Sequence, residues 1–285
     1  MKPAYLTHQA LQNFIASALS EDIGPGDFSS LASIPENKQG KAKLIIKDAG
    51  ILAGVELAGM IFTAVDPGLQ VEFLKKDGDQ VNPGDIGLIV SGSSVSILSA
   101  ERLVLNCMQR MSAIATKTHQ LTQLIHHTKA RLMDTRKTTP NFRLMEKWAV
   151  HIGGGVNHRF ALYDMVMLKD NHVDFAGGIE QAITRTKKYL DENGLHLKIE
   201  VETRNLDEVK QVLAVGGIDY IMLDNMDYAT MREAVQLIGG RYSTEASGGI
   251  TEETLAAVAE CGVDYISMGA LTHSVSSLDI SLKAF

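Results

Sequence analysis

The chain has 285 residues, of which 45% are hydrophobic and 21% charged, and its net charge is −7. This length and apolar content suit one large or two modest globular domains with a substantial core. The acidic balance argues against nucleic acid and anionic membranes as partners. The two cysteines, Cys107 and Cys261, are too far apart for a metal motif and predict free thiols in a reducing compartment.

Targeting and membrane signals are not evident in the sequence. Residues 1–5 have no signal-peptide pattern, and no apolar run reaches the roughly 18 residues that a membrane span requires. We therefore expect a soluble, cytoplasmic protein.

The first third of the chain predicts a small α/β domain. Residues 7–20 have helical apolar spacing, with Thr7 as the N-cap. The acidic, turn-rich segment 21–27 favours an Asx-type turn over a pair of functional carboxylates. The periodicity beyond it predicts a helix over residues 55–65 and strands over residues 43–47, 69–73 and 86–90.

A long helix is predicted over residues 99–126, with Ser99 as its cap. Arg102 then falls in the first turn, where a cation opposes the helix dipole. That position indicates either an anionic partner or an ordinary surface arginine. We place the domain boundary in this helix: residues 1–114 form an N-terminal domain, with residues 273–285 as a candidate addition, and residues 115–272 form the catalytic domain.

The second half of the chain repeats itself weakly. Residues 164–169, 219–224 and 264–269 each read as an Asp followed by a short apolar run, which is typical of a buried strand. Further strands are predicted at 132–134, 197–202 and 243–246, and helices at 178–190, 206–215, 230–237 and 252–260. This alternation predicts a parallel sheet. We favour a closed or nearly closed α/β barrel, because polar residues end the strands and no G-x-G-x-x-G follows the first one.

Basic side chains concentrate between residues 130 and 173 of this otherwise acidic chain. The candidates for a carboxylate-binding cluster are Arg136, Lys137, His158, Arg159 and Lys169, and Arg143, Lys147 and His172 lie in the same segment. Several cations together suit a ligand with more than one carboxylate. The alternative is a solvated basic face. Placement at strand ends and beside the triple glycine 153–155 favours a binding site.

Two further sub-sites are predicted at strand ends. Glu200 and Glu202 share one face of a strand, and Glu202 with Asp224 predicts a Mg²⁺ site completed by substrate phosphates. The alternative is that these acids only pair with nearby lysines. Glycine turns at Ser247-Gly248-Gly249 and Ser267-Met268-Gly269 predict a phosphate cradle. An acid with several carboxylates, a magnesium diphosphate and a monophosphate together describe phosphoribosyl diphosphate meeting an aromatic acid.

With these motifs in order, the chain resembles the quinolinate phosphoribosyltransferase family over essentially its whole length. The resemblance includes D-T-R-K-T-T-P at 134–140 and G-G-G-V-N-H-R at 153–159. Its other segments are residues 21–27, 101–112, 169–172, 200–202, 223–225 and 245–250. One departure is Asn141-Phe142, where the family usually has Gly-Leu; this change removes no charge.

The resemblance implies an N-terminal α/β sandwich domain and an incomplete, TIM-like α/β barrel, the fold of type II phosphoribosyltransferases. It implies a pentosyltransferase that joins quinolinate to phosphoribosyl diphosphate with Mg²⁺, and a homodimer, or a higher oligomer, with shared active sites. Arg102 would reach the neighbouring subunit's site. The implied catalytic residues are Lys137, Lys169, Glu202 and Asp224. The implied substrate contacts are Arg102, Thr135, Arg136, Lys137, His158, Arg159, Lys169, Glu202, Asp224, Ser247, Gly248, Gly249, Ser267, Met268 and Gly269.

Two other functions stay open from the sequence. One is a paralogue of the same fold linked to molybdenum transport, which resembles this chain less at residues 157–159 and 169–172. The other is a non-catalytic protein that binds a phosphorylated metabolite on a decayed barrel. Intact Glu202 and Asp224 argue against the second, because a sensor needs no metal-bound leaving group.

Overall fold

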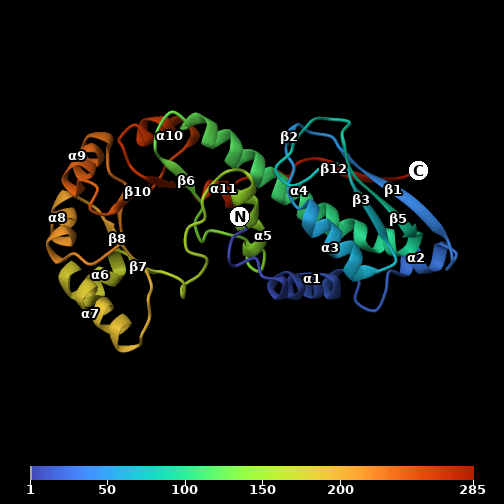
Figure 1. Ribbon diagram of the computed structural model, residues 1–285, viewed down its shortest axis with the longest axis horizontal. Helices are drawn as coiled ribbons and strands as arrows, with labels where there is room; N and C mark the ends of the chain where they lie inside the picture. The colour runs from blue at the N-terminus through green and yellow to red at the C-terminus, as the bar shows by residue number, and fades with distance from the viewer. Residues whose placement is uncertain (1) are drawn as a thin grey trace. The chain divides into compact units, whose positions relative to one another are not determined.

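The computed structural model describes residues 2–285 and divides them into two compact units (Figure 1). The first unit comprises the chain up to His119 together with Lys137–Gly154 and Ala270–Phe285, and the second comprises Gln120–Arg136 and Gly155–Gly269. The predicted boundary at residue 114 falls inside one continuous helix, α4 (Ser94–Leu124).

The first unit contains a four-stranded antiparallel sheet in the order β12-β1-β5-β3. Its strands are β1 (Gln39–Ile46), β3 (Gln70–Phe73), β5 (Ile86–Ser93) and β12 (Ile280–Ala284). Ala42, Leu44 and Ile46 alternate along β1 and are buried, as expected for a strand with one face on the core. The C-terminal strand β12 pairs with β1 in this sheet. A short ribbon joins β2 (Gly50–Ile51) to β4 (Gln80–Val81).

Two helices of the first unit, α1 and α2, begin at side-chain caps that the sequence supplies. The hydroxyl of Thr7 accepts a hydrogen bond from Ala10 N–H at 3.1 Å, as predicted. Asp27 accepts from Ser30 N–H at 3.1 Å, so the acidic segment does end in a capping turn. The helix α3 has the predicted bounds. The helices are α1 (His8–Asp22), α2 (Phe28–Ser33), α3 (Val55–Val65), α5 (Arg143–Ile152) and α11 (Ala270–His273).

The predicted start of the long helix at Ser99 is wrong. The helix α4 begins at Ser94, directly after β5, and Ser93 Oγ accepts from Ser96 N–H at 3.3 Å in the manner of a cap. Ser99 instead donates to Asp27 Oδ2 at 3.2 Å. Arg102 therefore lies beyond the first turn, and the argument from the helix dipole does not apply to it.

The second unit is a six-stranded parallel sheet in the order β6-β11-β10-β9-β8-β7. All six predicted strands are present. They are β6 (Arg131–Met133), β7 (Val166–Leu168), β8 (Ile199–Thr203), β9 (Tyr220–Asp224), β10 (Ser243–Ser247) and β11 (Tyr265–Ser267). Within residues 2–285, β6 and β7 are the end strands of this sheet and do not pair with each other, so the barrel is incomplete. Val156 forms a parallel bridge to Met133 beside β6.

Helices cover the outside of this sheet (Figure 1). They are α6 (Asp170–Ala176), α7 (Ile179–Glu192), α8 (Leu206–Val215), α9 (Tyr228–Ile238) and α10 (Glu252–Ala259). All except α6 were predicted. Five neighbouring strand residues that share one face are fully buried and form the apolar layer: Val201, Ile221, Leu223, Ala246 and Ile266. Since side chains alternate along a strand, the opposite face carries the polar residues. In the described chain, no helix combines the length and apolarity of a membrane span.

Candidate active site

Polar side chains lie at the carboxyl ends of the second unit's strands. Asp224 ends β9 and is the register partner of Ser247, which ends β10. Ser267 ends β11, Glu202 is the penultimate residue of β8, and Lys169 directly follows β7. These are the strand-end positions that the sequence predicted. Because parallel strands end at the same rim, that rim combines cations, carboxylates and hydroxyls.

Lys169 and Glu202 form an ion pair across the rim. Lys169 Nζ lies 3.1 Å from Glu202 Oε2. The Glu202 side chain is 9% exposed, whereas the Lys169 side chain is 46% exposed. The ammonium group is therefore accessible from solvent while the carboxylate stays sheltered beneath it. This is the lysine pairing that the sequence analysis held open for the acids.

The first glycine turn is built around Asn225. Asn225 has a left-handed φ of 53° and donates from Nδ2 to Asp224 Oδ2 at 2.7 Å. A Cβ at Gly248 would collide with the Asn225 side chain, so only glycine fits there. Gly249 also has a positive φ, of 60°, and Thr251 caps α10 just beyond the turn. The result is a close backbone approach at a helix N-terminus, the geometry suited to a phosphate.

The second glycine turn is anchored to the edge strand. The backbone N–H of Met268 donates to Met133 O at 3.0 Å, and Met268 is buried. This bond continues the pairing of β11 with β6 beyond Ser267. It fixes the direction in which the segment 267–269 leaves the strand.

Buried Asp134 holds the segment that carries two of the predicted cations. Asn157 Nδ2 donates to Asp134 Oδ2 at 2.7 Å, and His158 N–H donates to Asp134 Oδ1 at 2.8 Å. Val156 N–H donates to Leu132 O at 2.8 Å. Val156 therefore lies against β6 through an isolated parallel bridge, and Asp134 holds Asn157 and His158 beside it. Thr135 and Arg136 follow Asp134 in the same unit.

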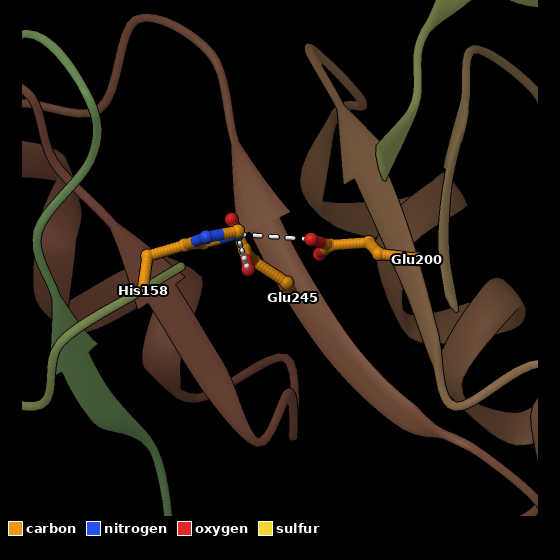
Figure 2. Close-up of side chains that lie close together, drawn as sticks. All are labelled: His158, Glu200 and Glu245. Carbon is orange, nitrogen blue, oxygen red and sulfur yellow. Dashed lines mark ion pairs between the residues drawn. The ribbon is translucent and has the colours of Figure 1, made fainter. Parts of the chain in front are cut away.

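The side chain of His158 points into the barrel, between two buried carboxylates (Figure 2). Its Nε2 lies 2.9 Å from Glu200 Oε2 and 3.3 Å from Glu245 Oε2. Glu200 is fully buried and Glu245 is 1% exposed. The sequence analysis missed this cluster: it predicted His158 as a substrate contact, treated Glu200 as second to Glu202, and mentioned Glu245 only as the start of a glycine turn. No short motif links these three positions.

The electrostatics of the cluster follow from its burial. Burial alone would lower the pKa of His158, whereas the neighbouring carboxylates of Glu200 and Glu245 raise it above its usual value; the N–H that Arg159 directs at Nδ1 opposes this rise, because a doubly protonated ring has no acceptor there. Burial raises the pKa of Glu200 to about 7, and the charge of Glu245 adds to that effect. The N–H of Arg159 donates to His158 Nδ1 at 2.6 Å, so the proton on the ring sits on Nε2.

The His158 cluster has the composition of a cation site, and within residues 2–285 it is the one such group of three or more ligands. Its geometry fits direct contact between the ring and the two carboxylates better. A metal on Nε2 requires a protonated Nδ1, whereas Nδ1 here accepts from the Arg159 amide. The atoms that would be the ligands already contact one another at hydrogen-bond distances. We therefore describe the cluster as a triad of close polar contacts, in which the carboxylate oxygens of Glu200 and Glu245 have no hydrogen-bond partner within the described residues.

Arg159 and Arg136 form the cationic part of the second unit's site. Burial lowers the pKa of Arg159, and the positive charge of Arg136 lowers it further. Arg159 Nη1 donates to Met165 O at 3.1 Å, which fixes one side of the guanidinium group. Two guanidinium groups close enough to repel each other favour an anion between them.

The remaining predicted cations lie in the first unit. Arg102 is on α4. Lys137 begins a loop that is fixed through its backbone, because Thr272 Oγ1 donates to Lys137 O at 2.8 Å. Arg143 and Lys147, which the sequence analysis grouped with the basic cluster, are on α5, and Lys147 is fully buried. The sequence analysis grouped Arg143 and Lys147 with the basic cluster because it did not predict α5, the helix between Pro140 and the glycines at 153–155.

Fully buried Glu146 holds the loop that follows Lys137. It accepts from Arg110 Nη2 at 2.9 Å and from Thr139 N–H at 3.0 Å. Arg110 also donates to Thr272 O. This network explains structurally why an arginine stands at position 110 of α4.

The fold and the strand-end site together define an open α/β-barrel protein with a polar rim at the carboxyl ends of its strands. Residues 27–112 match the family model for the quinolinate phosphoribosyl transferase N-terminal domain, and residues 114–283 match that for the C-terminal domain. The chain belongs to the quinolinate phosphoribosyl transferase family.

Individual relatives agree with this assignment. A mitochondrial quinolinate phosphoribosyltransferase (decarboxylating) of Nicotiana tabacum is 48% identical over 99% of this chain and 84% of its own. A probable nicotinate-nucleotide pyrophosphorylase (carboxylating) of Bacillus subtilis is 42% identical over 97% of this chain and 94% of its own. The crystal structure of NadC from Streptococcus pyogenes superposes with a TM-score of 0.91 at 39% identity, covering 98% of this chain and 97% of that one.

Proposed function

We propose that this protein transfers the phosphoribosyl group of phosphoribosyl diphosphate to quinolinate, with loss of carbon dioxide, to give nicotinate mononucleotide and diphosphate for NAD biosynthesis. The observation that carries the proposal is the rim of the second unit. The unit that carries this rim, with the carboxylates of Glu202 and Asp224, also carries Arg136 and Arg159, and the charge of Arg136 influences Arg159. The relatives named above act, by their names, in this reaction.

Quinolinate would bind through its two carboxylates. Arg136 and Arg159 supply planar guanidinium groups suited to bidentate bonds, and Lys169 supplies an accessible ammonium group. The mutual repulsion of the two arginines is relieved when a dianion binds. The family resemblance adds Lys137, Arg102 and His158 to the substrate contacts.

Glu202 and Asp224 would hold Mg²⁺. Both offer carboxylate oxygens near the ends of neighbouring strands, and one or two carboxylates plus substrate phosphates is the usual donor set for this ion. The ion would neutralise the departing diphosphate. The turns at 247–249 and 267–269 offer backbone N–H groups to the 5-phosphate.

The residues of the rim then act by positioning and charge. The arginines and Lys169 orient the pyridine so that its nitrogen attacks the anomeric carbon as the bond to diphosphate breaks. The carboxylates of Glu202 and Asp224 stabilise the positive charge that develops on the ribose. The product's pyridinium nitrogen then stabilises the carbanion left at C2 when its carboxylate leaves as carbon dioxide, and C2 takes up a proton. No covalent enzyme intermediate is required.

The proposal includes a homodimer in which Arg102 serves the neighbouring subunit's site. It also places the protein in the cytoplasm, a reducing compartment that suits the buried free thiols Cys107 and Cys261. The family resemblance is the support for the shared site.

A direct assay tests the proposed reaction. The purified protein is incubated with phosphoribosyl diphosphate, Mg²⁺ and quinolinate labelled at the C2 carboxylate. We expect labelled carbon dioxide, diphosphate and nicotinate mononucleotide in equal amounts. Turnover of neither substrate, or diphosphate release without carbon dioxide, would contradict the proposal.

A further inference from the structure

We propose that Glu200 and Glu245 are positioning residues that hold Arg159 in its binding geometry, acting through the imidazole of His158. The inference rests on the proposed function in one respect, namely that Arg159 binds a carboxylate of the acid substrate. It assigns the buried carboxylates a task distinct from that of Glu202 and Asp224.

The first step is the fixing of the imidazole. Nε2 of His158 lies 2.9 Å from Oε2 of Glu200 and 3.3 Å from Oε2 of Glu245, and the His158 side chain is 6% exposed. The two carboxylates come from different strands, β8 and β10, and Figure 2 shows the ring pointing between them. Contacts from two strands leave the ring with one orientation.

The second step leads from the imidazole to Arg159. The opposite ring nitrogen, Nδ1, accepts the backbone N–H of Arg159 at 2.6 Å. The guanidinium of Arg159 in turn donates to Met165 O at 3.1 Å. A continuous series of close polar contacts therefore runs from the buried carboxylates to the backbone of Arg159. A shift of the ring would move the point from which the Arg159 side chain starts.

The third step concerns folding stability, which the two buried carboxylates lower. Among the described residues, all four carboxylate oxygens of Glu200 and Glu245 are buried without a hydrogen-bond partner, and their contacts with His158 Nε2 are ion-pair contacts. Buried carboxylates with so few partners are unfavourable for stability. Apolar side chains would fill the interior of the barrel at lower cost. The pair is therefore better explained by what it does for the histidine than by stability.

The fourth step is the link to the rest of the rim. Glu200 lies two residues before Glu202 on β8, and Glu245 lies two residues before Ser247 on β10, so each pair shares a face of the sheet. The triad is thus the layer directly below the rim. It ties the segment bearing Arg159 to the strands that bear the proposed magnesium and phosphate contacts.

The variant Glu245→Gln tests the proposal by the sign of its effect. Electrostatics alone predict that removing a buried negative charge strengthens the binding of an anion. A role in positioning Arg159 predicts the reverse, namely weaker binding of the anion. We expect Glu245→Gln to raise the Kd for quinolinate, measured by calorimetry, roughly tenfold, as for the loss of one charge-assisted hydrogen bond. The affinity for phosphoribosyl diphosphate should stay unchanged.

A double-mutant cycle with Arg159→Lys tests whether Glu245 affects quinolinate binding through Arg159. If Glu245 acts through Arg159, Glu245→Gln should add little to the defect of Arg159→Lys. Thr244→Val is the matched control, because buried Thr244 is the preceding residue on β10 and bonds Asp264 at 2.8 Å. We expect it to lower the melting temperature without changing the Kd for quinolinate. If Glu245→Gln does not fold, Glu200→Gln should give the same result.

Several outcomes would overturn the inference. They are tighter quinolinate binding by both carboxylate variants, full additivity with Arg159→Lys, or equal losses for both substrates. Stoichiometric metal in the purified protein that is lost in Glu245→Gln would also overturn it, because the cluster would then be a cation site. Binding is measured separately from turnover, so a wild-type protein that binds quinolinate without reaction would refute only the proposed function.

Discussion

The Nε2 atom of His158 lies 2.9 Å from Oε2 of Glu200 in the interior of the second unit's barrel. The two side chains come from a segment beside β6 and from β8, which is not a neighbour of β6 in the sheet. Their contact therefore joins parts of an open barrel that no backbone hydrogen bond joins. It makes the polar layer under the rim part of the fold as well as of the site.

Removing His158 should destabilise the protein strongly. His158→Ala leaves the carboxylates of Glu200 and Glu245 buried without their shared partner. Breaking a buried pair in this way costs about 3–5 kcal/mol. Urea unfolding at neutral pH measures the loss, with exposed His196→Ala as the control. A loss for His158→Ala no larger than that of His196→Ala would show that the contact contributes nothing.

Lys169→Ala should reduce activity while leaving stability nearly intact. The Lys169 side chain is half-exposed, so its pair with Glu202 contributes only about 0–1 kcal/mol to folding. Its loss as a charged substrate contact corresponds to roughly 1.5–3 kcal/mol, which lowers kcat/KM by about 10- to 150-fold. Lys188→Ala, which breaks an exposed pair with Glu192, is the control. A parallel fall of stability and activity would assign Lys169 a structural role.

Removal of magnesium should abolish the transferase reaction. Chelation with EDTA is expected to stop diphosphate release, and added Mg²⁺ should restore it. Glu202→Gln and Asp224→Asn each remove one charged oxygen donor and should raise the Mg²⁺ concentration needed for half-maximal rate about tenfold or more. Unchanged activity in EDTA, or an unchanged Mg²⁺ requirement in both variants, would contradict the proposal that Glu202 and Asp224 hold Mg²⁺.

Arg102 and Lys169 should complement each other between subunits if the site is shared. Arg102→Ala and Lys169→Ala homodimers are both expected to be nearly inactive. Mixed dimers can assemble one site without either substitution, so refolding the two variants together should recover about a quarter of the wild-type activity if the subunits mix at random. No recovery, with hybrid dimers demonstrated by mass spectrometry, would place Arg102 outside a shared site.

The sequence predicted the barrel well because its signals are local. Several strands of the second unit are short apolar runs followed by a polar residue, and the three runs that begin with Asp164, Asp219 and Asp264 repeat the pattern. The rim followed from the same pattern, since the residue after a buried strand sits at its carboxyl end. Lys169 and Asp224 were located in this way.

Contacts over long sequence distance were not predictable in the same manner. The pairing of His158 with Glu200 and Glu245 depends on which strands face each other across the barrel, and the pattern of one strand carries no such information. The start of α4 was misplaced because serines at 93, 94, 96 and 99 all offer N-cap chemistry. The first residue of α4 is determined by where β5 ends, because the pairing of β5 with β1 extends to Ser93.

The most direct test of the account compares a pyridine diacid with a monoacid. Calorimetry measures the Kd of quinolinate and of nicotinate for the wild-type protein and for Arg159→Ala and Arg136→Ala. A carboxylate held by guanidinium is worth roughly 1.5–3 kcal/mol, so quinolinate should bind the wild type about 10- to 150-fold more tightly than nicotinate, and either substitution should remove most of that preference. Equal affinity for the two acids in the wild type, or a preference that survives both substitutions, would contradict recognition of a dianion by Arg136 and Arg159.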